Sequence, residues 1–109
     1  MVKLKRFDVC LVNLDPETRP AVIISPDSMN ISRLKTVIVA PMTSSIHDHF
    51  PTRVNVNFKK KKGQIALEQI RTIDKTRLKQ RIAILNEETM KKVEHAMAIS
   101  LDLSTMLNT

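Results

Sequence analysis

The sequence predicts a mainly β protein with helices, of the α+β class, in which a small barrel-like or strongly curved sheet is capped by one helix. Short runs rich in Val and Ile, separated by Pro and polar residues, fill the first three quarters of the chain. An amphipathic helical pattern follows them. A length of 109 residues with 42% hydrophobic content suits one domain over residues 1–109 and is too short for two.

The first three predicted strands are apolar on both faces, as buried central strands are. They cover Phe7–Leu14, Ala21–Ser25 and Thr36–Ala40. We expect each strand to stop at the proline that follows it, because proline cannot donate to a ladder. Between the second and third strands, the polar segment 27–34 is predicted to be irregular, with at most one helical turn.

The next segments alternate between apolar and polar residues or carry turn signals. Thr52–Phe58 places Val54, Val56 and Phe58 on one face, which is typical of a half-exposed strand. The lysine run Lys59–Lys62 and Gly63, the only glycine, are expected to form a turn. Two further strands are predicted at Gln64–Ile70 and Arg81–Leu85.

The C-terminal helix is predicted from an N-cap residue and from apolar residues at helical spacing. Asn86 is a favourable N-cap residue, and acidic residues follow it in the first turn. Met90, Val93 and Met97 recur at helical spacing, so we expect them to face the sheet from a helix that ends near Ser100.

Positive charge is concentrated in one part of the sequence. Eighteen Lys and Arg face eleven Asp and Glu, which gives a net charge of +7 and an isoelectric point near 9.9. Residues 53–81 hold ten basic and two acidic residues, so this segment carries the entire excess. Such a patch attracts a polyanion, either a nucleic acid strand or an acidic protein. The alternative for Lys59–Lys62 alone is a solvated run that only maintains solubility.

The few aromatic residues, the single cysteine and the short apolar runs argue against extensive base stacking, an intramolecular disulfide and a membrane span. Aromatic residues make up 3% of the chain, without Trp or Tyr, and we expect Phe7, Phe50 and Phe58 to lie inside, so contacts to phosphates and base edges should outweigh stacking. The single Cys10 cannot close an intramolecular disulfide and is expected in the core. No apolar run approaches the roughly twenty residues of a membrane span, so we expect a cytoplasmic protein without a membrane partner.

Neither a metal nor a cofactor is expected. His47 and His49 are two residues apart, but no second cluster of ligands follows them, and a single glycine cannot build a phosphate-binding loop. His95 is expected to be exposed on the helix.

Three segments at strand ends are candidates for a site, because the sheet holds such side chains rigidly while they reach solvent. They are Thr18-Arg19-Pro20 before one strand, Pro41-Met42-Thr43-Ser44-Ser45 after another, and the unusual strand Gln64–Asp74.

These segments also carry a family resemblance. The motifs, in chain order, are Lys5-Arg6-Phe7-Asp8-Val9, Leu14-Asp15-Pro16, Arg19-Pro20 with residues 21–25, residues 36–43, Pro51-Thr52, and Gln69-Ile70-Arg71-Thr72-Ile73-Asp74. Over residues 5–85 the sequence resembles the MazF/PemK toxins of bacterial toxin–antitoxin systems. The resemblance implies an SH3-like barrel of the CcdB/PemK type. It also implies a homodimer, and a sequence-specific, metal-independent endoribonuclease that cleaves single-stranded mRNA by 2′-hydroxyl attack and is neutralised by a cognate acidic antitoxin.

The resemblance assigns catalysis to Arg19 and Thr43. A guanidinium offers a fixed fork of donors to phosphate oxygens, and a threonine hydroxyl adds a neutral donor. The proton acceptor is left open. Supporting roles are assigned to Glu17, Thr18, Ser44 and Ser45, and RNA binding to Arg53, Lys59, Lys60, Lys61, Lys62, Gln69, Arg71, Lys75 and Arg77.

The sequence departs from the family between Pro16 and Arg19. Relatives carry a longer loop there, whereas only Glu17 and Thr18 separate the two motifs here. The loop is either deleted or omitted from the sequence, and an intact mass near 12.4 kDa would indicate deletion.

Two questions of function and assembly remain open at this stage. The alternative function is a binding protein of the same fold, a gyrase poison or an inactive toxin remnant. Four apolar residues at the C-terminal end are expected either in a dimer interface or in the core. They are Leu101, Leu103, Met106 and Leu107.

Overall fold

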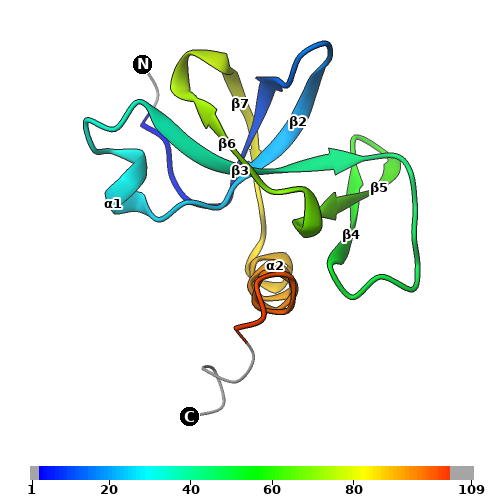
Figure 1. The fold of residues 1–109 in the computed structure, drawn as a ribbon. Coiled ribbons are helices and arrows are strands. Elements are labelled where there is room, and N and C mark those ends of the chain that lie inside the picture. Colours follow the sequence, from blue (N-terminus) through cyan, green and yellow to red (C-terminus); the bar gives the residue numbers. More distant parts are fainter. Residues whose placement is uncertain (1–2, 104–109) are drawn as a thin grey trace.

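A curved antiparallel sheet with a helix against one face forms the protein in the computed structural model, which describes residues 3–103 (Figure 1). The strands are β1 (Asp8–Asn13), β2 (Thr18–Ile23), β3 (Thr36–Thr43), β4 (Arg53–Phe58), β5 (Lys61–Ala66), β6 (Arg71–Asp74) and β7 (Leu78–Ile84). The helices are α1 (Asp27–Asn30) and α2 (Glu87–Ser100), and two short 3₁₀ turns are η1 (Leu67–Gln69) and η2 (Lys75–Arg77).

Strand β3 is the axis of the sheet. The ladders run in the order β4-β5-β3-β2-β1-β7, and β6 also pairs with β3. One edge of β3 pairs with β2, whereas the opposite edge pairs with β6 at residues 36–39 and with β5 at residues 42 and 43. The predicted fold class, mainly β with a C-terminal helix, is confirmed.

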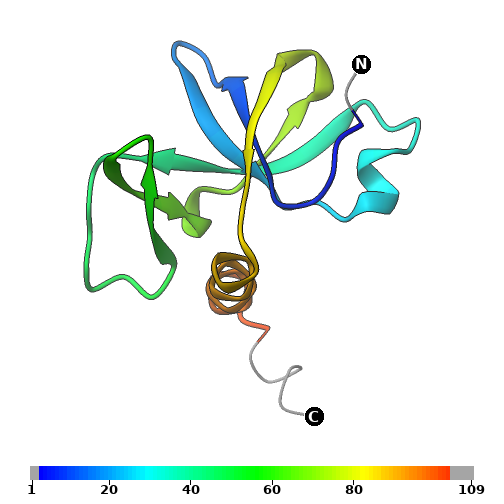
Figure 2. The same cartoon turned by 180° about the vertical axis from the view of Figure 1, so that it is seen from behind.

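The two faces of the sheet bury different hydrophobic clusters. Because side chains alternate along a strand, Val9 belongs to one cluster and Cys10 to the other. Helix α2 contributes Val93 and Ala96 to the first cluster and lies beneath the sheet in both views (Figures 1 and 2). The predicted cap is confirmed, because the Asn86 side chain accepts a hydrogen bond from the Thr89 N–H at 2.8 Å.

Pro41 does not stop its strand, so the prediction that the strand ends at Ala40 is wrong. The Ile24 N–H donates to the Ile38 carbonyl, and the alternation of the ladder therefore aims the nitrogen of residue 41 at the other edge of β3. That edge has no ladder at Ala40 and Pro41, because η1 separates β6 from β5 there. The missing N–H of Pro41 thus costs no hydrogen bond.

The glycine of the predicted turn lies inside a strand instead. The β4–β5 hairpin turns at Lys59 and Lys60, which adopt φ values of 51° and 65°. Gly63 pairs with Val56 in β5, where an added Cβ would lie 3.0 Å from the Thr43 carbonyl oxygen. The glycine therefore permits a close backbone approach, and the lysines supply the turn.

The other boundaries differ from the predictions by a few residues. The strand expected at Gln64–Ile70 is divided, since β5 ends at Ala66 and η1 leads into β6. Strands β2 and β7 each begin three residues earlier than expected. Within residues 3–103, no helix is long and apolar enough to cross a membrane.

Candidate functional site

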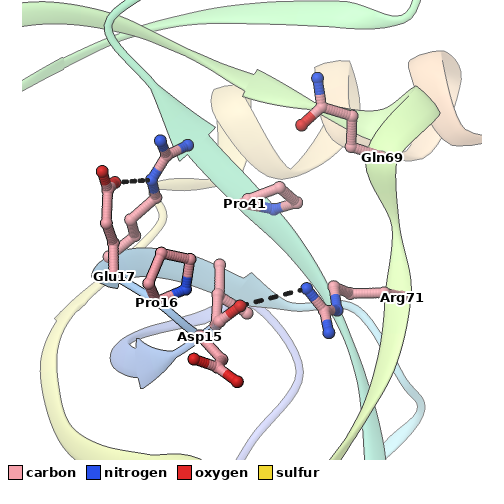
Figure 3. Close-up of a pocket in the computed structure, with 8 residues that line it drawn as sticks. Asp15, Pro16, Glu17, Pro41, Gln69 and Arg71 are labelled. Carbon is pink, nitrogen blue, oxygen red and sulfur yellow. Dashed lines mark hydrogen bonds and ion pairs between the residues drawn. The ribbon is translucent and has the colours of Figure 1, made fainter.

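A cavity of about 400 Å³ opens where η1 interrupts the ladder on β3. It is lined by Leu14, Asp15, Pro16, Glu17, Arg19, Pro41, Gln69 and Arg71. Figure 3 shows the β1–β2 hairpin residues Pro16 and Glu17 on one side, Pro41 in the middle, and Gln69 and Arg71 on the other. The cavity therefore brings together residues from all three candidate segments, which are far apart in the sequence.

Arg19 reaches this cavity from β2 and is available to a ligand. Its Nε lies 2.9 Å from the Glu17 Oε2, and the two side chains are 43% and 64% exposed. An ion pair in such a position is worth at most about 1 kcal/mol, because water screens both charges. A phosphate can therefore replace the Glu17 carboxylate at little cost.

Thr43 lies at the end of β3, and the structure does not place it among the residues that line the cavity. Its Oγ1 accepts a hydrogen bond from the Ser45 N–H at 3.0 Å, which fixes the turn that leaves β3. Ala21 of β2 pairs with Pro41 of β3 in an antiparallel ladder. If this register is extended by two residues, Arg19 lies opposite Thr43. The ladder ends before that point, so Arg19 and Thr43 occupy corresponding positions on strands that are no longer hydrogen-bonded to each other.

Arg71 and Arg77 contact the β1–β2 hairpin. Arg71 Nη1 lies 3.5 Å from the Leu14 carbonyl oxygen, and Arg77 Nη1 lies 3.3 Å from the Asn13 carbonyl oxygen. Both contacts are to neutral acceptors, so the guanidinium charges are not neutralised there. Gln69 and Arg71 are exposed beside Arg19, as the expected role in RNA binding requires.

The predicted basic patch is divided between two ends of the sheet. Lys59–Lys62 are exposed on the β4–β5 hairpin. Lys75 lies in η2, beyond β6, and its Nζ donates to the Ser32 carbonyl oxygen at 3.1 Å. Figures 1 and 2 show the β4–β5 hairpin and the β6–β7 connection toward opposite ends of β3, since β5 pairs with residues 42 and 43 and β6 with residues 36–39. The cavity around Arg19 and Arg71 lies near the first half of β6, between these two groups.

The expected role of Arg53 in RNA binding stays a prediction, and the structure shows its side chain engaged within the protein. Its side chain is 5% exposed and makes a two-pronged contact with Glu68, with Nε and Nη2 at 2.8 and 2.7 Å from Oε2. Nη1 also donates to the Ser45 carbonyl oxygen at 3.0 Å. The guanidinium is thus used within the protein, where it holds the segment that follows Thr43.

Glu68 completes this contact on η1. Partial burial would raise the pKa of its carboxyl, but hydrogen bonds from Arg53, from its own backbone and from Thr52 outweigh burial and lower the pKa below the usual 4.5. Glu68 is therefore ionised at neutral pH and stays paired with Arg53.

Gln64 begins the candidate segment Gln64–Asp74, yet no role was predicted for its side chain. Its side chain is 1% exposed, and its Oε1 accepts hydrogen bonds from the His47 N–H at 3.0 Å and from Arg53 Nη1 at 3.2 Å. Its Nε2 donates to Asn55 Oδ1 at 2.8 Å. A buried amide with its donors and acceptors satisfied fixes the β3–β4 loop. The only signal in the sequence was a glutamine between Gly63 and an apolar run.

The remaining candidates lie outside this region. Cys10 is buried, and burial first, then the nearby charge of Asp8, raise the pKa of its thiol to about 11 despite Arg81. The thiol is therefore protonated and inert at neutral pH. Within residues 3–103, no group of three His, Cys, Asp or Glu side chains could hold a metal ion.

The supporting residues and the C-terminal apolar residues are placed only in part. Thr18, Ser44 and Ser45 are exposed. Leu101 and Leu103 are 49% and 39% exposed, which disfavours a core role within this chain, and Met106 and Leu107 lie outside the described residues.

Comparison with known proteins identifies the family. The model of the PemK-like, MazF-like toxins of type II toxin–antitoxin systems matches residues 5–101. The chain belongs to this family. An endoribonuclease MazF from Staphylococcus saprophyticus is 41% identical over 115 aligned residues, which cover 94% of this chain and 95% of the relative. This alignment is longer than the 109-residue chain, so the MazF relative has residues that this chain lacks.

Solved structures share the fold. An endoribonuclease in complex with its cognate antitoxin from Mycobacterial species superimposes with a TM-score of 0.81 at 24% identity, over 92% of this chain and 96% of that one. MazF from Deinococcus radiodurans gives a TM-score of 0.78 at 18% identity, over 94% and 99% of the two chains.

Proposed function

We propose that this protein is an endoribonuclease toxin that cleaves single-stranded mRNA at specific short sequences, without a metal ion. The observation that carries the proposal is the cavity in which Arg19 from β2 and Arg71 from β6 face one space beside Gln69. Two guanidinium groups that line one open cavity suit the oxygens of a phosphodiester. The family and the 41% identical endoribonuclease from Staphylococcus saprophyticus support this activity.

RNA supplies its own nucleophile in the proposed reaction. The ribose 2′-oxygen loses its proton and attacks the adjacent phosphorus, while the bond from phosphorus to the 5′-oxygen breaks. The leaving oxygen takes up a proton, so the products are a 2′,3′-cyclic phosphate and a 5′-hydroxyl. The protein needs only to align the attacking and leaving oxygens and to stabilise negative charge on the phosphorane.

Arg19 and Thr43 stabilise the negative charge of the phosphorane in this proposal. Arg19 leaves Glu17 and donates its fork of N–H groups to the non-bridging oxygens, whose charge grows in the transition state. The Thr43 hydroxyl donates from across the strands, because its oxygen already accepts the Ser45 N–H and its own hydrogen is free. Arg71 and Gln69 hold the phosphate or sugar on the far side of the cavity.

The exposed lysines and the exposed C-terminal leucines have roles in RNA attraction, inhibition and dimer formation in this proposal. Lys59–Lys62 lead the RNA toward the site by charge, which makes affinity depend on salt. The acidic antitoxin competes for this basic surface, and the protein acts in the cytoplasm as a homodimer of one-domain chains. The exposed Leu101 and Leu103 favour the dimer over a core role.

Cleavage of a long single-stranded RNA in the presence of EDTA tests the function. We expect discrete fragments that end in 2′,3′-cyclic phosphates, at sites set by a short sequence. Arg19→Ala and Thr43→Val should abolish these fragments at equal protein concentration, whereas Lys91→Ala on the exposed face of α2 is the matched control that should cut normally. Random degradation, or normal cutting by Arg19→Ala, would refute the proposal.

The inactive toxin remnant is the second candidate, and the short β1–β2 hairpin favours it. Glu17 pairs with Arg19 in the segment where the family resemblance implies a longer loop. RNA binding without cleavage by the wild-type protein would establish this alternative.

A further inference from the structure

Two aromatic rings are stacked on the surface of the β3–β4 loop. The rings of His47 and Phe50 are parallel within 11°, with centroids 5.0 Å apart. Both residues are exposed, and Phe50 is 50% accessible to solvent. The expectation that Phe50 would lie inside is therefore wrong, and half of the surface of this apolar residue is open to a ligand.

The loop holds this pair in place by hydrogen bonds at both ends. The His47 N–H donates to the buried Gln64 side chain at 3.0 Å. The Phe50 N–H donates to the His47 carbonyl oxygen at 3.4 Å, and the Arg53 N–H donates to the Phe50 carbonyl oxygen at 3.1 Å. The rings are thus presented by an ordered turn, so little entropy is lost when a ligand binds them.

The pair is connected to the candidate catalytic threonine. The Ser45 N–H donates to Thr43 Oγ1 at 3.0 Å, and Ser45 Oγ lies 3.5 Å from His47 Nε2. Contacts through Ser45 thus link the ring pair to Thr43, so the rings lie near the residue proposed to contact the scissile phosphate.

We propose that the exposed face of the His47–Phe50 pair is the binding site for one unpaired base of the RNA, adjacent to the scissile phosphate. This inference rests on the proposed function and adds a specificity-determining site to it. Proteins that read single strands stack splayed bases on aromatic side chains, and His serves as well as Phe. The scarcity of aromatic residues in the sequence then concentrates stacking at this one position.

Binding of an uncleavable RNA tests the platform. The probe is a fluorescein-labelled single strand that spans a mapped cleavage site and carries a 2′-deoxyribose at that site. We expect Phe50→Leu, which removes the ring and keeps an apolar side chain, to raise the Kd about tenfold. Phe50→Trp should recover the affinity that Phe50→Leu loses. Ile46→Ala is the matched control, because it removes another exposed apolar side chain of the loop and should bind as the wild type.

Abasic substitution identifies the base. Removing the single base that stacks should weaken wild-type binding about tenfold, and it should have no further effect on Phe50→Leu, since the two changes delete one contact. Equal Kd values for wild type and Phe50→Leu, or full additivity at every position, would overturn the platform alone. Absence of RNA binding by the wild type would overturn the proposed function with it.

Discussion

Arg19 in β2 and Arg53 in β4 carry the same side chain, yet their surroundings differ. Arg19 is 43% exposed and has one carboxylate partner that is itself 64% exposed. Arg53 is 5% exposed, makes a two-pronged contact with Glu68 and donates to the Ser45 carbonyl oxygen. The difference teaches that a guanidinium near a site is free to serve substrate only where its partner can be exchanged for a phosphate.

The largest effect is expected from Arg19. Arg19→Ala should lower kcat for RNA cleavage about 10²- to 10³-fold, as the loss of one preorganised donor to transition-state charge does. The free energy of unfolding should remain within about 0.5 kcal/mol of the wild-type value, because the side chain is exposed. Single-turnover cleavage and calorimetry measure the two quantities. A loss of stability equal to that of an Arg53 variant would erase the distinction between the two arginines.

Arg53 is expected to behave in the opposite way. Arg53→Ala should lower the free energy of unfolding by about 1–3 kcal/mol, because Glu68, Ser45 and Gln64 lose a common donor. Urea titration measures this loss. Arg53→Lys keeps the charge without the fork and should recover only part of the stability. A variant that folds as stably as wild type but binds RNA less well would instead restore the original expectation of a phosphate contact.

The same contact predicts a dependence on pH. The pKa of Glu68 is lowered in the fold, so its stabilisation is present above the unfolded pKa and disappears as the pH falls through the folded value. Urea titrations from neutral pH to about pH 3 should therefore show a smaller acid-induced loss of stability in Arg53→Ala than in wild type. Equal losses in the two proteins would show that the pairing of Glu68 with Arg53 does not contribute to acid unfolding.

Gly63 connects the buried network to Thr43. Gly63→Ala would place a Cβ 3.0 Å from the Thr43 carbonyl oxygen, so the end of β3 must move by a few tenths of an ångström. We expect a loss of about 1 kcal/mol in stability and a lower kcat with little change in KM, since binding groups elsewhere are unaffected. Unchanged kcat in a destabilised variant would separate the position of Thr43 from catalysis.

Local patterns predicted the apolar strands and the capped helix, because the spacing of apolar residues and the identity of the cap residue depend only on neighbouring residues. Asn86 and Val93 therefore take their expected places. The predictions for Pro41 and Gly63 were wrong, and the burial of Arg53 was not foreseen, because each depends on a partner far away in sequence. Pro41 is tolerated only where η1 leaves an edge of β3 open, and Arg53 is buried only because Glu68 and Gln64 surround it. The cavity residues combine distant segments in the same way, and the family resemblance, not the local pattern, brought them together.

The smallest effect is expected at the β4–β5 turn, where exposed charge can be separated from folding. Lys59 and Lys60 adopt positive φ values that non-glycine residues disfavour, and Asn-Gly is the preferred pair for such a turn. Lys59→Asn with Lys60→Gly should therefore stabilise the fold by about 0.5–1 kcal/mol, by chemical denaturation. The same variant loses two exposed charges, so the salt dependence of RNA binding should become shallower. If both results are observed, Lys59 and Lys60 resemble Arg19: their exposed charges serve a bound ligand and do not stabilise the fold. A destabilised variant with an unchanged salt slope would place them with Arg53 instead.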